Sequence, residues 1–142
     1  KKEPSGLLAN DSWRPNGLTL IPWRAGKPLA WDVTVTATLA DSYIRASTNA
    51  AGAAAEMAAA RKINKYSDLP ASVIFQPLAF ETLGPINSSA VECIVDLGRR
   101  LSANSGEVRE TFFLFQRLSV LIQRFNAILL HDTFTTDVDP DL

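Results

Sequence analysis

Two stretches in the first half of the chain show the pattern of β-strands. From Leu29 to Thr38, apolar residues take every second position, and the residues between them are mostly polar. Successive side chains of a strand point to opposite faces, so this stretch predicts a strand with one apolar and one polar face. The short apolar run 18–21 predicts a strand before it. Gly26 and the prolines around it predict a hairpin that pairs the two strands antiparallel.

A helix and a third strand follow. Residues 50–66 are rich in alanine, the best helix former, and predict a helix that can lie close against a sheet because its side chains are small. Residues 72–82 are rich in valine, isoleucine and phenylalanine and predict a strand. Pro77 lies inside it and cannot donate a ladder hydrogen bond, which favours an edge strand or a bulge.

The last third of the chain predicts two helices. Asn87 or Ser88 caps the first, which runs to about residue 102. Apolar residues at three- and four-residue spacing predict the longest helix over 108–130. The order β-β-α-β-α-α predicts an α/β fold with a small mixed sheet flanked by helices.

These elements predict one domain over residues 14–131, a size that can bury a core without disulfides. Residues 1–13 are rich in turn-forming residues and predict an irregular arm. Residues 132–142 carry four aspartates and predict an acidic, frayed tail.

Composition excludes several kinds of site. The single cysteine, Cys93, excludes a disulfide framework and a zinc site built from cysteines. The single histidine, His131, excludes a metal site with several histidines. The sequence has neither an apolar N-terminal stretch nor an unbroken run of 18 apolar residues, so we expect an intracellular protein that does not enter a membrane.

Charge is distributed unevenly. Residues 1–66 carry nine Lys or Arg and five Asp or Glu, while residues 67–142 carry five and ten. The first part therefore has a net charge of +4 and the second of −5, although the whole chain carries −1. A basic first part suits a polyanion. The alternative is a chance asymmetry on a solvated surface.

Asp32 is the first candidate for chemistry, because it interrupts an apolar and β-branched strand. A carboxylate buried there without a partner costs free energy, so it needs a cation, a donor or a metal ion. An ion pair or an exposed strand face is the structural interpretation. A ligand for Mg²⁺, which proteins hold by one or two carboxylates, is the functional interpretation.

Three basic residues of the alanine-rich helix come next. Lys62 and Lys65 are three residues apart and share one helix face, and Arg61 lies beside them. They are either a solvated helix face or a source of positive charge for a scissile phosphate or an attacking water. Tyr66 follows and is expected to anchor the helix end against the sheet.

Glu81 lies near the end of the third predicted strand, where it either closes the same polar cluster or is an exposed strand-end carboxylate. Arg117 and Arg124 lie two turns apart on the last predicted helix. They are placed to contact a phosphate backbone, or they belong to a solvated surface.

Taken together, the motifs resemble a known family. Arg14-Pro15-Asn16, a hairpin, Asp32-Val33-Thr34 and then Lys62 and Lys65-Tyr66 resemble the restriction-like endonuclease domain of the PD-(D/E)XK type found in non-LTR retrotransposon proteins. The stretch from 14 to 126 is similar to reverse-transcriptase-associated segments. These share the look of Gly17-Leu18-Thr19-Leu20-Ile21-Pro22-Trp23, Trp31-Asp32, Glu81-Thr82-Leu83-Gly84 and Gln123-Arg124.

The resemblance implies a restriction-endonuclease-like core that cleaves phosphodiester bonds of DNA with Mg²⁺ or Mn²⁺. It also implies a retroelement origin, the rest of a retroelement polyprotein as a partner, and a nuclear location. Asp32 and Asn16 match metal-binding positions, and Asp32 with Lys62 or Lys65 matches the catalytic positions. The residues expected to contact nucleic acid are Arg14, Arg61, Arg117 and Arg124.

The chain departs from the family pattern at two residues. Asn16 stands where the family has a metal-binding Asp, and an amide oxygen brings no negative charge, so metal affinity should fall. Thr34 stands where many members of the broad fold have Lys, so the lysine must come from the helix. Two alternatives to an active nuclease follow. One is an inactive nuclease fold that binds nucleic acid or protein, and the other is an unrelated α/β interaction domain in which Asp32 is only ion-paired.

Overall fold

The computed structural model describes residues 14–40, 44–45 and 50–136. The predicted arm 1–13 and the last part of the predicted tail, 137–142, lie outside the described residues. The chain divides into two compact units, residues 1–93 and residues 94–142, and each is described here by itself.

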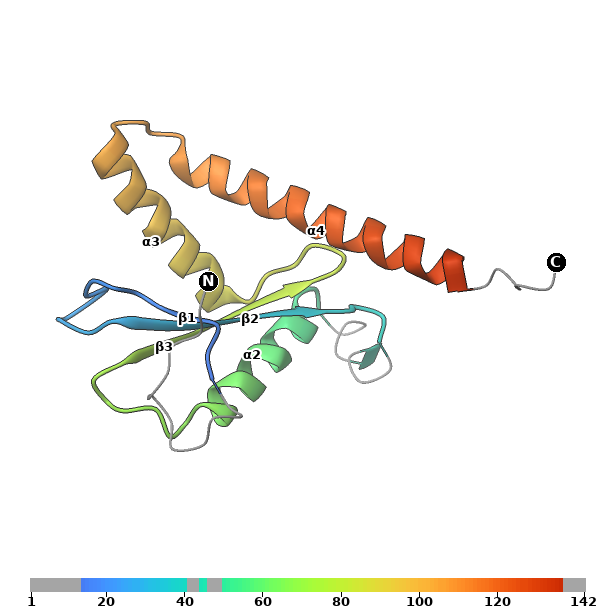
Figure 1. Ribbon diagram of the computed structural model, residues 1–142, viewed down its shortest axis with the longest axis horizontal. Coiled ribbons are helices and arrows are strands. Elements are labelled where there is room, and N and C mark those ends of the chain that lie inside the picture. Colours follow the sequence, from blue (N-terminus) through green and yellow to red (C-terminus); the bar gives the residue numbers. More distant parts are fainter. Residues whose placement is uncertain (1–13, 41–43, 46–49, 137–142) are drawn as a thin grey trace. The chain divides into compact units, whose positions relative to one another are not determined.

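The first unit is built on a three-stranded mixed sheet, which confirms the sheet predicted from the sequence (Figure 1). The strands are β1 (Gly17–Leu18), β2 (Leu29–Thr36) and β3 (Ile74–Glu81), in the order β1-β2-β3. β1 pairs antiparallel with β2, as the hairpin predicted, and β2 pairs parallel with β3. β1 is shorter than the predicted run because the chain bends at Leu20 and Ile21, after a last hydrogen bond from Thr19 N–H to Leu29 O. Pro77 lies in β3, an edge strand, where its missing N–H costs least.

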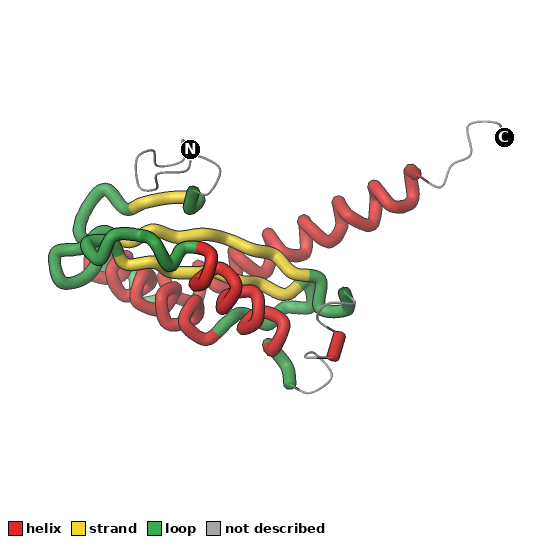
Figure 2. Tube along the Cα trace, turned by 90° about the horizontal axis from the view of Figure 1, so that it is seen from below, coloured by secondary structure: helices red, strands yellow, loops and turns green. Residues whose placement is uncertain are grey.

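Helix α2 (Ala53–Lys65) covers one face of β2 and β3 (Figure 2). Parallel strands need a crossover connection, and α2 supplies it. Alanines form the buried apolar cluster between the helix and the sheet, made of Ala55, Ala58, Ala59 and Ala79. The small side chains let the helix lie close to the strands, as the sequence predicted.

The alternation along β2 is confirmed, but its polar face is the buried one. Asp32 and Thr36 are 3% and 5% exposed, while Val33 on the opposite face is 44% exposed. Two contacts accompany this burial: Lys62 of α2 gives Asp32 a cation, and the Thr36 hydroxyl donates to the Phe80 carbonyl of β3 at 3.5 Å. A strand that buries a carboxylate beneath an alanine-rich helix has given up apolar burial for a specific polar contact.

The hairpin depends on one glycine. A Cβ atom on Gly17 would lie 2.0 Å from the ring of Trp31, its partner across the β1–β2 pair. Only a residue without a side chain therefore leaves room for the indole at this position. Pro15, just before, is fully buried. This packing holds the segment that carries Asn16 against β2.

Helix α3 (Ser88–Ser105) begins in the first unit, and residues of three elements hold its N-terminus. Asn87, one of the two predicted caps, is the residue before the helix, but its side-chain oxygen is used by β3. Its side-chain oxygen accepts a hydrogen bond from Ala79 N–H at 2.8 Å. Glu56 of α2 accepts hydrogen bonds from the N–H and hydroxyl of Ser88 at 2.6 and 2.8 Å. The start of α3 is thus tied to both β3 and α2.

The second unit contains the rest of α3 and helix α4 (Glu110–Thr136), which runs further than the predicted helix. The two helices approach closely where a Cβ on Gly98 would lie 2.0 Å from Thr111 Oγ1. In the turn between them, hydrogen bonds from the Arg109 guanidinium hold the pKa of the Glu107 carboxyl below its usual value.

Apolar side chains are exposed along much of α4, including Phe112, Val120, Leu121 and Ile128. Within the described residues, 110–132 are long and apolar enough to cross a membrane by length and composition alone. Core helices of soluble proteins pass the same test, and this stretch contains two arginines, which are costly at a membrane centre. The expectation that the protein does not enter a membrane stays a prediction.

Candidate functional site

Asp32 and Lys62 come together beneath α2. Lys62 Nζ lies 2.7 Å from Asp32 Oδ2, and the side chains are 26% and 4% exposed. Although the ammonium is in contact, Asp32 Oδ2 is buried without a hydrogen bond of acceptable geometry. The pair is therefore held by charge, and an oxygen of the carboxylate keeps unused acceptor capacity. Lys62 faces solvent on its other side, because a quarter of its side chain is exposed.

A second polar oxygen shares this face of β2. Thr34 is the next residue on the same side of the strand, and its Oγ1 is buried without a hydrogen bond among the described residues. Two oxygens on adjacent same-face positions thus lack the hydrogen bonds that buried polar atoms normally make. Each exception of this kind needs a structural or functional reason.

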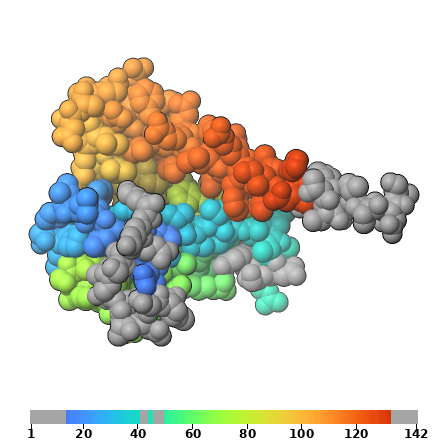
Figure 3. Space-filling view, viewed as in Figure 1, coloured from blue at the N-terminus to red at the C-terminus, as the bar shows by residue number. Residues whose placement is uncertain are grey.

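The segment 14–16, which leads into β1, is bonded to β2 beside Asp32. Asn16 Oδ1 accepts a hydrogen bond from Val33 N–H at 2.6 Å, one residue along β2 from Asp32. The Tyr66 hydroxyl donates to the backbone carbonyl of Arg14 at 2.8 Å, and Tyr66 is buried at the end of α2, as predicted. The segment 14–16 is therefore bonded to β2 next to Asp32 and to the end of α2. In the space-filling view, the hairpin segment (blue) and the segment of α2 and β3 (green) lie on the surface of this unit (Figure 3).

The other predicted basic residues differ in their placement. Lys65 Nζ lies 5.2 Å from the centre of the Tyr66 ring and is not the lysine that contacts Asp32. Arg61 is exposed on α2 beside Lys62. Of the two alternatives left open by the sequence, the geometry favours Lys62 as the residue that acts with Asp32.

Arg117 and Arg124 are exposed on α4, which belongs to the second unit. Because they lie seven residues apart, they are on the same side of this helix. Their part in binding nucleic acid stays a prediction.

Glu81 does not join the Asp32 cluster. It is only 1% exposed, so the interpretation as an exposed strand-end carboxylate is wrong. It pairs with Thr36, whereas Asp32 pairs with Pro77, four residues earlier along β3. At about 3.3 Å per residue, Glu81 and Asp32 are separated by roughly 13 Å along the sheet, too far to share a ligand.

The donor atoms near Asp32 fit a divalent cation, but a weakly held one. Mg²⁺ prefers oxygen ligands and is often held by one or two carboxylates, with water completing the shell. Asp32 supplies one carboxylate with an oxygen that lacks a hydrogen bond, and Asn16 supplies an uncharged amide oxygen that already accepts from Val33. Within the described residues no group of three or more His, Cys, Asp or Glu is arranged to hold a metal.

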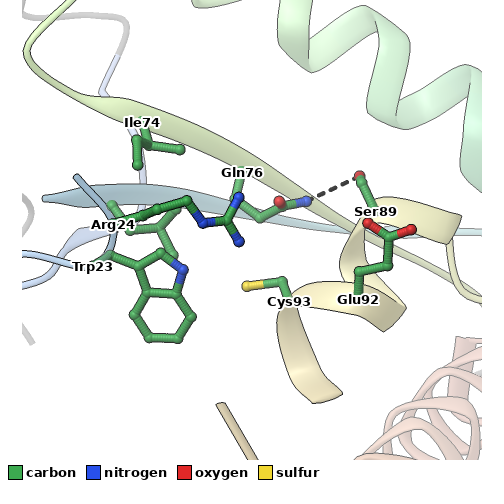
Figure 4. Close-up of a pocket in the computed structure, with 8 residues that line it drawn as sticks. Trp23, Arg24, Ile74, Gln76, Ser89, Glu92 and Cys93 are labelled. Atoms are coloured by element: carbon green, nitrogen blue, oxygen red, sulfur yellow. Dashed lines mark hydrogen bonds between the residues drawn. The ribbon is translucent and has the colours of Figure 1, made fainter. Parts of the chain in front are cut away.

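A separate hollow lies on the other face of the sheet (Figure 4). The indole of Trp23 and the Cys93 thiol border it, and Gln76 Nε2 donates to Ser89 Oγ at 3.0 Å along one side. Arg24 and Glu92 bring charges of both signs to its rim. Leu29, which β2 contributes to its lining, is on the odd-numbered side of that strand, opposite to the face that holds Asp32.

Sequence reasoning missed two features of the site. The first is Thr34, which it treated only as a replacement for a lysine. The second is that Asp32, Thr34 and Thr36 form the face that α2 covers. The signal was present in two parts, the alternation along β2 and the small side chains of the helix. Helix alanines leave room for the polar side chains of the facing strand.

Comparison of the chain with protein-family models, with curated proteins and with solved structures gives no match. Function is therefore inferred from the site itself and from the resemblance of its motifs.

Proposed function

We propose that the first unit is a divalent-metal-dependent nuclease domain of retroelement type whose activity is weakened by Asn16. Two contacts carry this proposal: Lys62 lies against the Asp32 carboxylate, and Asn16 bonds the backbone N–H of Val33, the next residue of β2. The restriction-endonuclease-like core, a DNA substrate, a polyprotein context and a nuclear location are parts of the same proposal. They follow from the resemblance of the motifs.

Charge balance supports the weakened activity. Asp32 and Lys62 together are neutral, and the Asn16 amide adds no charge. A divalent cation approaching this group gains little Coulomb energy, whereas one additional carboxylate would give the group a net charge of −1. An aspartate at position 16 would keep an oxygen for Val33 N–H and would add a second, charged oxygen in place of the amide nitrogen.

Each residue has a distinct chemical role in this proposal. Asp32 and Asn16 would hold the metal, which when bound supplies positive charge at the phosphate and a more acidic water. The Lys62 side chain is 26% exposed and places a second positive charge where a phosphate approaching Asp32 would lie. Arg14 is two residues before Asn16, and Arg61 directly precedes Lys62. In this proposal both add sequence-independent attraction for a phosphate backbone.

One observation also favours the inactive alternative. The contact of 2.7 Å between Lys62 and Asp32 provides the buried carboxylate with a cation and makes a metal unnecessary for the fold. A nuclease fold in this state keeps its basic residues and binds nucleic acid without cutting it. Plasmid cleavage distinguishes the weakened nuclease from the inactive nucleic-acid-binding fold.

Nicking of supercoiled plasmid with Mg²⁺ or Mn²⁺ tests the proposal. The variants are the unaltered chain, Asn16→Asp, and Asn16→Asp combined with Asp32→Ala. Asn64→Asp is the matched control, because it adds the same charge at an exposed position of α2. We expect Asn16→Asp to cut faster than the unaltered chain by one to several orders of magnitude, because a metal-binding carboxylate is restored.

The proposal further requires that Asp32→Ala and removal of the metal with a chelator each abolish the cutting, and that Asn64→Asp leave it unchanged. If folded Asn16→Asp does not cut with either metal, the nuclease proposal is overturned. Plasmid binding without cutting by every variant would then support the inactive nucleic-acid-binding alternative.

A further inference from the structure

The alanine contact beneath α2 leaves the position of the helix poorly defined by packing. Helices usually lock onto their neighbours by ridges of large side chains that fit into grooves. Along the body of α2 the contact consists of Ala55, Ala58 and Ala59 against Ala79, which offers little to resist sliding, and larger side chains pack at its end, where the Tyr66 ring lies 4.9 Å from that of Phe75. The first turns of α2 therefore need a contact other than packing to fix them along the strands, and their position decides how Lys62 lies against Asp32.

Glu81 provides a polar contact at the other end of the helix. Its Oε2 accepts a hydrogen bond from Ala55 N–H at 3.3 Å, in the first turn of α2. The residue before the helix is Gly52, which has no side chain to cap it. The first turn of a helix has unpaired N–H groups, and a carboxylate is favourable there. Glu81 therefore caps α2 from a neighbouring strand.

The backbone of Glu81 is held on both sides, which makes it a firm anchor. Its N–H donates to Pro85 O at 2.8 Å, and its carbonyl accepts from Gly84 N–H at 3.0 Å. In addition, it is paired with Thr36 in the sheet. The side chain thus extends from a rigid strand end. A change in its length or hydrogen bonding would therefore shift the first turn of α2.

The spacing of the two polar contacts agrees. Ala55 and Lys62 are seven residues apart, about 10 Å along a helix. Glu81 and Asp32 are roughly 13 Å apart along the strands. The helix is therefore held at both ends of nearly the same length of sheet, by Glu81 near its start and by Asp32 near its end.

We infer that Glu81 is a positioning residue for Lys62. By accepting the Ala55 hydrogen bond it sets the position of α2 along the sheet, and so places the Lys62 ammonium on Asp32. The role does not involve contact with a substrate or a metal. Its consequence for catalysis rests on the proposed function, but the placement itself is a property of the fold.

Reactivity of Lys62 toward an amine-acylating reagent tests this inference, with mass spectrometry to follow each lysine. Glu81→Met and Glu81→Ala remove the acceptor, and the methionine fills nearly the same volume so that a folded variant is obtained. Glu81→Gln keeps an acceptor oxygen. Glu56→Ala is the matched control, because Glu56 is also in the first turn of α2 but is bonded to Ser88.

We expect Glu81→Met to raise the acylation rate of Lys62 several-fold, because the ammonium loses its shielded place on Asp32. The acylation rate at exposed Lys27 should stay the same in this variant. In the Glu81→Gln variant, Lys62 should react as slowly as in the unaltered chain. The inference is overturned if Lys62 reacts equally fast in folded Glu81→Met and in the unaltered chain. It is also overturned if Glu56→Ala raises the Lys62 rate by the same factor, or if Lys62 reacts as fast in Glu81→Gln as in Glu81→Met. Acylation measures the placement of Lys62, whereas plasmid nicking measures cleavage. Either proposal can therefore be refuted without refuting the other.

Discussion

Replacement of Lys62 by methionine should destabilise the first unit more than replacement of Asp32 by asparagine. Lys62→Met leaves the Asp32 carboxylate buried without a cation, while Asp32→Asn leaves an ammonium that can turn to water from a side chain already 26% exposed. Breaking a buried pair by removing one partner costs about 3–5 kcal/mol. Because Lys62 is partly exposed, solvent screening lowers the expected cost to about 1.5–3 kcal/mol.

The sign of the double variant is the sharper test. Adding Asp32→Asn to Lys62→Met removes the unpaired charge, so we expect the double variant to be more stable than Lys62→Met alone by about 1 kcal/mol. A single substitution in the core rarely stabilises a protein. This one should, because the orphaned carboxylate is the source of the cost.

Urea unfolding followed by tryptophan fluorescence measures these differences, since all three tryptophans lie in the first unit. With a slope of about 2 kcal/mol per molar urea, the expected loss for Lys62→Met shifts the midpoint by about 1 M. Lys27→Met is the control, because Lys27 is exposed in the same unit. The reasoning fails if Asp32→Asn costs as much as Lys62→Met, or if it does not restore stability to the Lys62→Met chain.

Two further substitutions test the packing that holds the site. Gly17→Ala should destabilise the first unit by about 1–3 kcal/mol in the same urea assay, because the added Cβ overlaps the Trp31 ring; an unchanged midpoint would show that the indole moves freely. Asn87→Ala leaves the buried Ala79 N–H without its side-chain acceptor and should cost about 1–3 kcal/mol, a loss that calorimetry would also detect. If Asn87→Ala were neutral, water would have to reach that N–H.

Much of the fold could be predicted from local patterns, because each element has its own signal. Alternation gave β2, alanine gave α2, and Pro77 indicated an edge strand. β1 was predicted too long because an apolar run does not show where hydrogen bonding to the next strand ends. The end of α4 was predicted too early, since the apolar stripe fades before the helix does.

The site was predictable in its members but not in its arrangement. The interruption of an apolar strand pointed to Asp32, and the spacing on the helix pointed to Lys62 together with Lys65. Which lysine reaches the carboxylate depends on how α2 is rotated and how far it lies along the strands. Those quantities are set by contacts such as the one between Glu81 and Ala55, which join residues 26 positions apart. A pattern that repeats over a few residues carries no information on such contacts.

The parallel pairing of β2 with β3 has a consequence for synthesis on the ribosome. Asp32 is paired with Pro77, so the strand that completes the sheet emerges 45 residues after the one it must join. At about 5–20 residues per second, β2 waits roughly 2–9 s with one edge open. The polar residues of β2 remain hydrated during that delay, and a hydrated strand is less prone to join the edge of another nascent chain. The carboxylate that defines the finished site would thus also act as a safeguard while the chain is incomplete.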